Sequence, residues 1–216
     1  MNRSVKVRFF MSFIFAALLS PAAFSQTLKD FFNSDATSAI FLGIDFTKTK
    51  LIDDASTDAK DIVERQYAGI NEGAATDSKK LSLAGAFHKS VMDHDLGPVN
   101  KRNLKIDPSQ IKSTNTSDFH RLKEEDISAL VKGFDFDGKK GLGILFVMEA
   151  MSKTGKAAAI WVTFIDMTTK KMLFTERMEE KVGMGFGFKN YWVIPVKRLL
   201  DDIKDDKFKE WQKKYS

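Results

Sequence analysis

Apolar positions recur at two different periods along the chain, and the two periods predict different elements. The segment 38–46 (SAIFLGIDF) is apolar on both alternating faces except at Asp45, which is typical of an interior strand covered on both sides. From Ala59 to Ile70 the apolar residues instead recur about every 3.6 residues, and Gly73 provides a stop signal. This second segment is therefore predicted to be an amphipathic helix.

The middle of the chain carries weaker patterns. The segment 81–89 predicts a short helix, and 91–99, which is interrupted by a Gly-Pro pair, predicts a strand or an extended segment. Helical spacing returns over 124–132, and Gly133 is a typical residue for the end of that helix.

After Gly141 the pattern becomes rich in strand-forming residues. Three runs cover 143–152, 157–167 and 171–180, and short polar turns separate them. Consecutive strands joined by such turns predict an antiparallel meander.

The last long helix is predicted from the spacing of apolar residues after Trp192. Proline is tolerated only in the first turn of a helix, so Pro195 places the predicted start between Tyr191 and Pro195. Together these elements predict an α+β fold in which helices pack on one face of a mostly antiparallel sheet, with a three-stranded meander in the C-terminal half and a long C-terminal helix.

Residues 1–25 have the composition of a secretory signal peptide. Three basic residues and no acid precede an apolar run from Phe9 to Leu19, and small residues stand before Gln26. The apolar run is shorter than the roughly 20 residues that a spanning helix needs. We therefore expect cleavage after Ser25, with 26–216 forming one α+β domain that does not span the membrane; an uncleaved anchor is the alternative.

Cysteine content and net charge limit the expected compartment and the kinds of partner. The signal segment predicts export to the periplasm or extracellular surface. Because the chain has no cysteine, we expect that it is not a lipoprotein and has no disulfides. Loss of the three basic residues of the signal segment lowers the net charge of +5 to +2. This small charge gives no indication of nucleic-acid binding.

The stretch GMGFGFKNYW, residues 183–192, is the most distinctive motif of the chain. Its glycines follow the spacing G-x-G-x-G, whereas a dinucleotide loop needs G-x-G-x-x-G between a parallel strand and its helix. We favour a packed corner between strand and helix, and a binding surface made by the same residues is the alternative. The candidate binding residues are Gly183, Gly185, Phe186, Gly187, Phe188, Asn190, Tyr191 and Trp192.

Three carboxylates lie in or at the ends of strand-like runs. They are Asp45, Glu149 and Asp166, and an unpaired charge at such positions would be costly to bury. Two of them meeting within about 10 Å in a cleft would permit glycosidase-like acid/base chemistry.

Two polar clusters resemble metal sites without matching them. The segment 135–138 (DFDG) lacks the third acid and the closing glutamate of a calcium loop. The segment 88–95 contains His88, Asp93, His94 and Asp95, but the interval between the two histidines does not fit a helical pair. We expect neither a metal nor a cofactor.

Parts of the C-terminal half resemble known exported proteins. The pattern of 161–166, a turn and 172–175 resembles the late hairpin of periplasmic domains similar to the amino-terminal domain of TolB, and the resemblance covers about 141–205. The stretches 141–144 (GLGI) and 185–192 also resemble a group of uncharacterised exported proteins of Gram-negative bacteria. These resemblances imply a fold and a compartment but no catalytic residue.

The combined pattern favours a non-enzymatic module of the periplasm or cell envelope that binds an envelope protein or a cell-wall component. A carboxylate-based hydrolase is one alternative. A carrier for a small apolar ligand is the other, and it would need a closed apolar pocket of a few hundred Å³.

Overall fold

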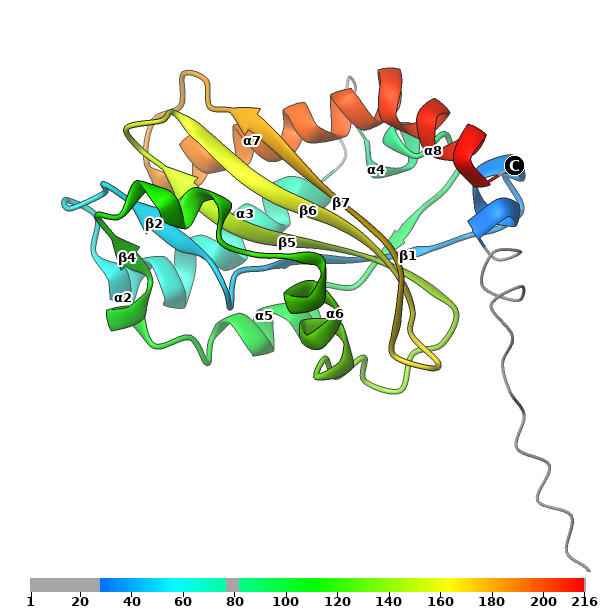
Figure 1. Ribbon diagram of the computed structural model, residues 1–216, viewed down its shortest axis with the longest axis horizontal. Helices are drawn as coiled ribbons and strands as arrows, with labels where there is room; N and C mark the ends of the chain where they lie inside the picture. The colour runs from blue at the N-terminus through cyan, green and yellow to red at the C-terminus, as the bar shows by residue number, and fades with distance from the viewer. Residues whose placement is uncertain (1–27, 77–81, 216) are drawn as a thin grey trace, which may run out of the picture.

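A computed structural model describes residues 28–76 and 82–215, and the predicted signal segment and its cleavage site lie outside this part of the chain. A seven-stranded sheet forms the centre, and helices lie on both of its faces (Figure 1). The strands are β1 (Ile40–Asp45), β2 (Lys50–Ile52), β3 (Asp93–His94), β4 (Lys112–Ser113), β5 (Leu142–Ser152), β6 (Ala157–Asp166) and β7 (Lys171–Lys181).

The central strand is β5, which is buried along its whole length. One edge of β5 pairs in parallel first with β1 and then with β2, and the other edge pairs with β6 in antiparallel orientation. The short strands β3 and β4 extend the parallel side by pairing with β1 and β2, while β7 pairs with β6.

The prediction of a mostly antiparallel α+β sheet is wrong, because four of the six strand pairings are parallel. The fold is α/β: helix-containing crossovers connect the parallel strands, and the antiparallel meander of β5, β6 and β7 forms only one side of the sheet. Parallel neighbours must be joined by long connections, and here those connections carry the first helices of the chain.

The helices vary in length, and two of them continue through π-helical turns. They are α2 (Ala59–Asp61), which leads through the π-helical segment Ile62–Gln66 into α3 (Tyr67–Ala75), then α4 (Leu83–Ala86), α5 (Gly97–Asn103), α6 (Glu124–Lys132) and α7 (Phe188–Asp202), which leads through Ile203–Lys207 into α8 (Phe208–Tyr215). Short 3₁₀ helices cover Pro108–Gln110 and Thr116–His120, and residues 28–33 are also helical.

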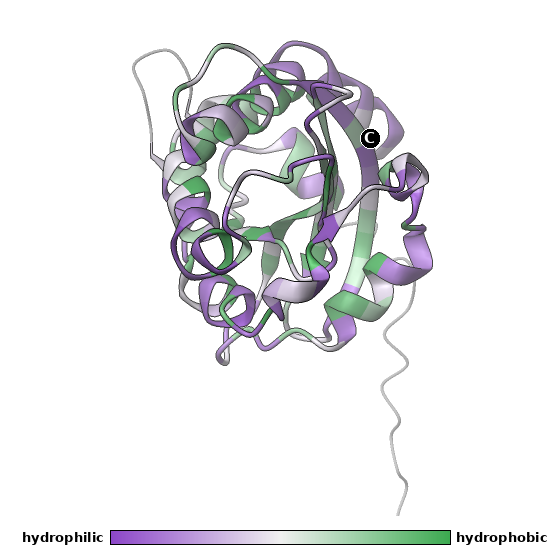
Figure 2. Ribbon diagram, turned by 90° about the vertical axis from the view of Figure 1, so that its left-hand side faces the viewer, coloured by the Kyte–Doolittle hydropathy of each residue, from purple (hydrophilic) through white to green (hydrophobic). Residues whose placement is uncertain are grey.

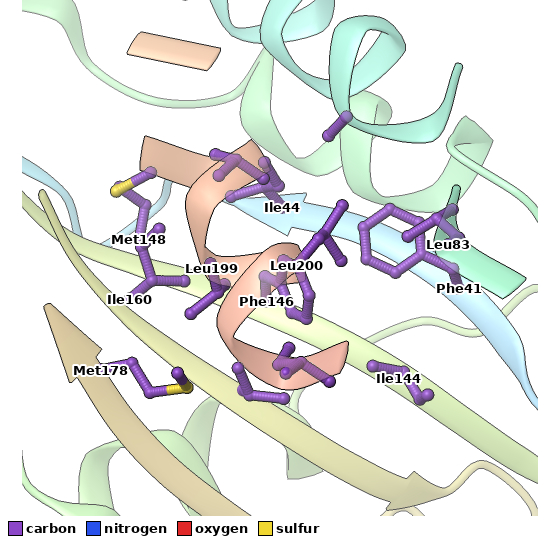
Figure 3. Close-up of a cluster of buried hydrophobic side chains, with 14 of the residues drawn as sticks. Phe41, Ile44, Leu83, Ile144, Phe146, Met148, Ile160, Met178, Leu199 and Leu200 are labelled. Atoms are coloured by element: carbon purple, nitrogen blue, oxygen red, sulfur yellow. The ribbon is translucent and has the colours of Figure 1, made fainter. Parts of the chain in front are cut away.

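Helices cover both faces of the sheet, so the prediction that they pack on one face is wrong. The larger apolar cluster joins one face to α3, α4, α7 and α8, and includes Trp192, Leu199 and Leu200. Figure 3 shows Leu199 and Leu200 of α7 beside Ile144 and Phe146 of β5. A second cluster joins the other face to α5 and α6. In Figure 2 the apolar positions gather on the strands and on the helix sides that face them.

The start of α7 differs from the predicted one. The helix begins at Phe188, with Gly187 as its N-cap, and Pro195 lies inside it. Proline has no N–H to donate within a helix, yet the apolar side of α7 keeps the helix on the sheet, with Trp192 and Val196 buried on either side of Pro195. Within the described residues no helix is long and apolar enough to cross a membrane.

Candidate functional site

The corner between β7 and α7, residues 182–187, contains the glycine motif. Gly187 has φ 79° and ψ 163°, a backbone conformation that is essentially restricted to glycine. Gly185 is needed for space, because a Cβ at this position would lie 2.7 Å from the carbonyl oxygen of Asn190. These two glycines therefore allow the chain to turn directly from the strand into the helix.

Hydrogen bonds hold the corner against the first turn of α7. The Asn190 side chain donates from Nδ2 to the carbonyl oxygen of Phe186 at 3.0 Å, and the backbone N–H of Tyr191 donates to the carbonyl oxygen of Gly187 at 3.1 Å. The predicted role of the glycines in backbone geometry agrees with this arrangement. The Asn190 side chain therefore holds the backbone of the corner at Phe186 against the first turn of α7.

The predicted aromatic residues separate into a buried and an exposed set. Trp192 is fully buried, with Tyr191 and Phe188 packed beside it at ring-centroid distances of 5.0 and 6.3 Å. Phe186 is 97% exposed and its neighbour Met184 is 100% exposed. The motif thus anchors the helix with one set of side chains and presents the other set to solvent.

The surroundings of the exposed pair are basic. Lys181 and Lys189 flank the corner in sequence, and both are exposed. The β5–β6 turn lies at the same end of the molecule (Figure 1), since the Lys156 carbonyl oxygen accepts a hydrogen bond from the N–H of Val182 at 3.0 Å. From this turn, Lys153 places its Nζ 5.0 Å from the ring centroid of Tyr191.

Asp45 is buried in an ion pair. Its Oδ2 lies 2.7 Å from Arg102 Nε, and its Oδ1 accepts hydrogen bonds from the N–H and the hydroxyl of Thr47. The side chain is fully buried, so a substrate could reach this carboxylate only by displacing Arg102.

Glu149 is also fully buried and makes hydrogen bonds through both oxygens. Its Oε1 accepts from the N–H of Leu122 at 2.6 Å, and its Oε2 accepts from Trp161 Nε1 at 3.0 Å and from Arg177 Nε at 2.7 Å. Asp45 lies opposite Val147 in register, two residues before Glu149 on β5. The structure therefore places two predicted carboxylates on adjacent strands, each beside its own arginine.

Asp166 lies at the far end of β6 from the corner, because Asp166 pairs with Lys171 whereas Ala157 pairs with Lys181. Its carboxylate accepts hydrogen bonds from the N–H of Thr168 and the hydroxyl of Thr169, both at 2.8 Å. This carboxylate stabilises the β6–β7 turn and is not brought to the other two.

His88 and Asp95 of the segment 88–95 have other contacts in the structure. His88 Nε2 lies 2.8 Å from the carbonyl oxygen of Lys204, and its ring stacks on Phe208. Asp95 forms an ion pair with Lys139 at 2.5 Å. In the part of the chain that the structure describes, no three His, Cys, Asp or Glu side chains form a group that could hold a metal ion.

A buried carboxyl group that the sequence patterns did not indicate lies near the corner. Glu180 of β7 is 8% exposed, and burial together with a hydrogen bond to Asp202 of α7 raises its pKa to about 8. Arg198 acts in the opposite direction and lowers this pKa. The pair connects the end of β7 to α7, and only the three-dimensional contact between strand and helix could have identified it.

Surface hollows lie away from the predicted carboxylates. A groove of about 560 Å³ is lined by residues of the β5–β6 turn, the Thr116–His120 helix and the end of β7. A groove of about 790 Å³ lies beside Asp53, Lys112 and Asn115. Both are open to solvent, unlike the closed apolar pocket that a carrier would need.

Comparisons with known proteins include a distant structural neighbour. No protein-family model matches the chain, and no curated protein matches its sequence. A solved structure, "Crystal Structure of Lipoprotein GNA1162 from Neisseria meningitidis", aligns over 78% of this chain and 98% of its own, with 14% sequence identity and a TM-score of 0.33. A likeness of this size supports no inference about function.

The comparisons bear on two predictions. The structural neighbour is named as a lipoprotein, which conflicts with the part of our localisation prediction that said this chain is not a lipoprotein, and we withdraw that part. The resemblance to the amino-terminal domain of TolB is not confirmed.

Proposed function

We propose that this chain is a non-enzymatic binding module that attaches to a component of the cell envelope through the β7–α7 corner. The observation that carries this proposal is the full exposure of Met184 and Phe186 on a corner that glycines and hydrogen bonds hold in shape. Exposed apolar side chains that gather in one patch often mark a binding site, whereas singly exposed ones do not.

The alternative of a carboxylate-based hydrolase has less support. Asp45 and Glu149 are buried beside arginines, and Asp166 stabilises a distant turn. General acid/base chemistry requires a carboxyl group within hydrogen-bond reach of a substrate, and neither buried carboxylate is accessible.

Co-sedimentation with a Gram-negative envelope fraction tests the proposal. The double variant Met184→Ser/Phe186→Ser removes the exposed pair, and Val91→Ser/Leu104→Ser removes two apolar side chains that are 72% and 57% exposed elsewhere. All four side chains face solvent, so both variants should fold.

We expect the wild type and the Val91/Leu104 variant to bind equally, and the Met184/Phe186 variant to bind at least about tenfold more weakly, since its apolar contact area is lost. Equal binding by all three proteins, or no binding by the wild type, would overturn the proposal.

A further inference from the structure

The segment 181–189, at the tip of the β7–α7 corner, contains apolar and basic residues and no acid. The sequence from Lys181 to Lys189 is KVGMGFGFK, and its two large exposed apolar side chains are Met184 and Phe186. The facing β5–β6 turn is KTGK, which adds Lys153 and Lys156. The four lysines are exposed, so the apolar tip has cationic side chains on both of its sides.

Most of this positive charge is not neutralised within the fold. Lys153 lies 3.5 Å from the carboxylate of Asp54. Among the residues that the structure describes, ion pairs are found for none of Lys156, Lys181 and Lys189. Arg198 also approaches the corner, since a Cβ on Gly183 would lie 3.6 Å from its guanidinium nitrogen.

The position of the tip is determined by the backbone. The close approach of Gly185 to Asn190 and the hydrogen bond from Asn190 to Phe186 leave little freedom at the exposed pair. The aromatic anchor Trp192 connects the same helix to the core. Burial of the tip by a partner would therefore cost little backbone entropy, and mainly the rotamer entropy of the two exposed side chains.

We propose that the partner of this tip is an anionic lipid surface, into whose headgroup region Met184 and Phe186 insert while the surrounding lysines contact the lipid phosphates. The inference rests on the proposed function and names the component bound. Apolar side chains beside lysines are the combination that binds at the boundary between headgroups and acyl chains of anionic membranes.

A lipid surface fits this tip better than a protein does. A stable protein interface buries about 800 Å² on each partner around an apolar centre. Here two apolar side chains protrude and charged residues follow directly. A bilayer interface accepts such a small protrusion, because lipid headgroups rearrange around it and supply negative charge.

Vesicle co-sedimentation provides the test. The full chain is mixed with vesicles of phosphatidylcholine alone, or of phosphatidylcholine with phosphatidylglycerol. We expect binding only to the anionic vesicles and weaker binding as salt screens the charges. Met184→Ser/Phe186→Ser should weaken binding by at least about tenfold, and Lys181→Gln/Lys189→Gln by about fivefold for each lysine, which corresponds to about 1 kcal/mol per charge.

Matched controls are Val91→Ser/Leu104→Ser for apolar residues and Lys48→Gln/Lys213→Gln for exposed lysines, and both should bind like the wild type. Absence of binding to anionic vesicles, or equal loss in control and tip variants, would overturn the lipid proposal. If envelope binding that depends on the tip remained in that case, the proposed function would stand with a protein or cell-wall partner. If envelope binding were also absent, both proposals would be wrong.

Discussion

Arg177 of β7 donates from Nε to Oε2 of Glu149 on β5 at 2.7 Å, and this bond passes across the intervening strand β6. The same guanidinium donates to the carbonyl oxygen of Phe119 at 2.5 Å and pairs with Glu179. Glu149, which the sequence indicated as a candidate catalytic carboxylate, thus helps to join the outer strand β7 to the central strand β5.

Removing one partner of this pair should be costly. Arg177→Met leaves a buried carboxylate without its cation, and we expect the free energy of unfolding to fall by about 3–5 kcal/mol in urea denaturation. The double variant Arg177→Met/Glu149→Gln removes both charges and should recover part of that loss. If the double variant lost the sum of the two single losses, the two residues would not be coupled.

The Glu180 carboxyl should make stability depend on pH. Because burial beside Asp202 raises its folded pKa from 4.5 to about 8, the folded state retains a proton that the unfolded chain has lost over this window. Stability should therefore fall as the pH rises from about 4.5 to about 8.

Thermal unfolding across this pH range measures the effect. Glu180→Gln should flatten the decline and be more stable than the wild type at pH 8, whereas Glu72→Gln, at an exposed helical position, should keep the wild-type slope. An unchanged slope in Glu180→Gln would contradict the assignment.

The two glycines of the corner should resist substitution for different reasons. Gly185→Ala brings a Cβ against the backbone at Asn190, and Gly187→Ala places a side chain at φ 79°. We expect each to lower the free energy of unfolding by about 1–3 kcal/mol in urea denaturation.

Gly133→Ala is the matched control, since its Cβ would make only ordinary contacts at 3.7 Å and its φ is −86°. It should change stability by less than about 1 kcal/mol. If Gly185→Ala and Gly187→Ala changed the free energy of unfolding as little as this control does, the corner would not require glycine.

Trp192 should be an anchor of the core. Its side chain is fully buried between α7 and the sheet, so Trp192→Ala should cost about 3–5 kcal/mol. Its Nε1 has no hydrogen-bond partner among the described residues, so Trp192→Phe, which removes this N–H, should cost clearly less. Equal losses in the two variants would indicate that packing volume is not the main contribution.

Local patterns predicted the elements better than their arrangement. The helix Glu124–Lys132 is confirmed, because its apolar spacing and the glycine after it are local signals. The prediction of an extended segment over 91–99 missed the start of the helix Gly97–Asn103. The Gly-Pro pair interrupts a strand pattern, but proline is also common at the first positions of a helix.

The parallel pairing of β1 with β5 could not be predicted in the same way. Asp45 and Val147 are opposite each other in register but about 100 residues apart in the chain, and neither strand carries a signal for the partner it selects. Both strands are buried on both faces, so their sequence patterns also do not indicate which edge pairs with a neighbour or whether that pairing is parallel.

The structure places the glycine motif at a corner between β7 and α7, but the burial of its individual side chains could not be predicted. The sequence indicated a corner of glycines and aromatics, yet which aromatics are buried depends on where α7 begins. With the start at Phe188, Trp192 points to the core while Phe186 stays outside the helix. The arginine partners of Asp45 and Glu149 depend on tertiary contacts and had no sequence signal.

One measurement tests directly whether the β7–α7 corner is the binding surface. The chain has no cysteine, so Met184→Cys creates a single labelling site that retains Phe186, and Val91→Cys provides an exposed control. With an environment-sensitive fluorophore at each position, we expect a blue shift at 184 and none at 91 when the envelope fraction is added. A blue shift at 91 alone, or at neither position while the protein co-sediments, would contradict it.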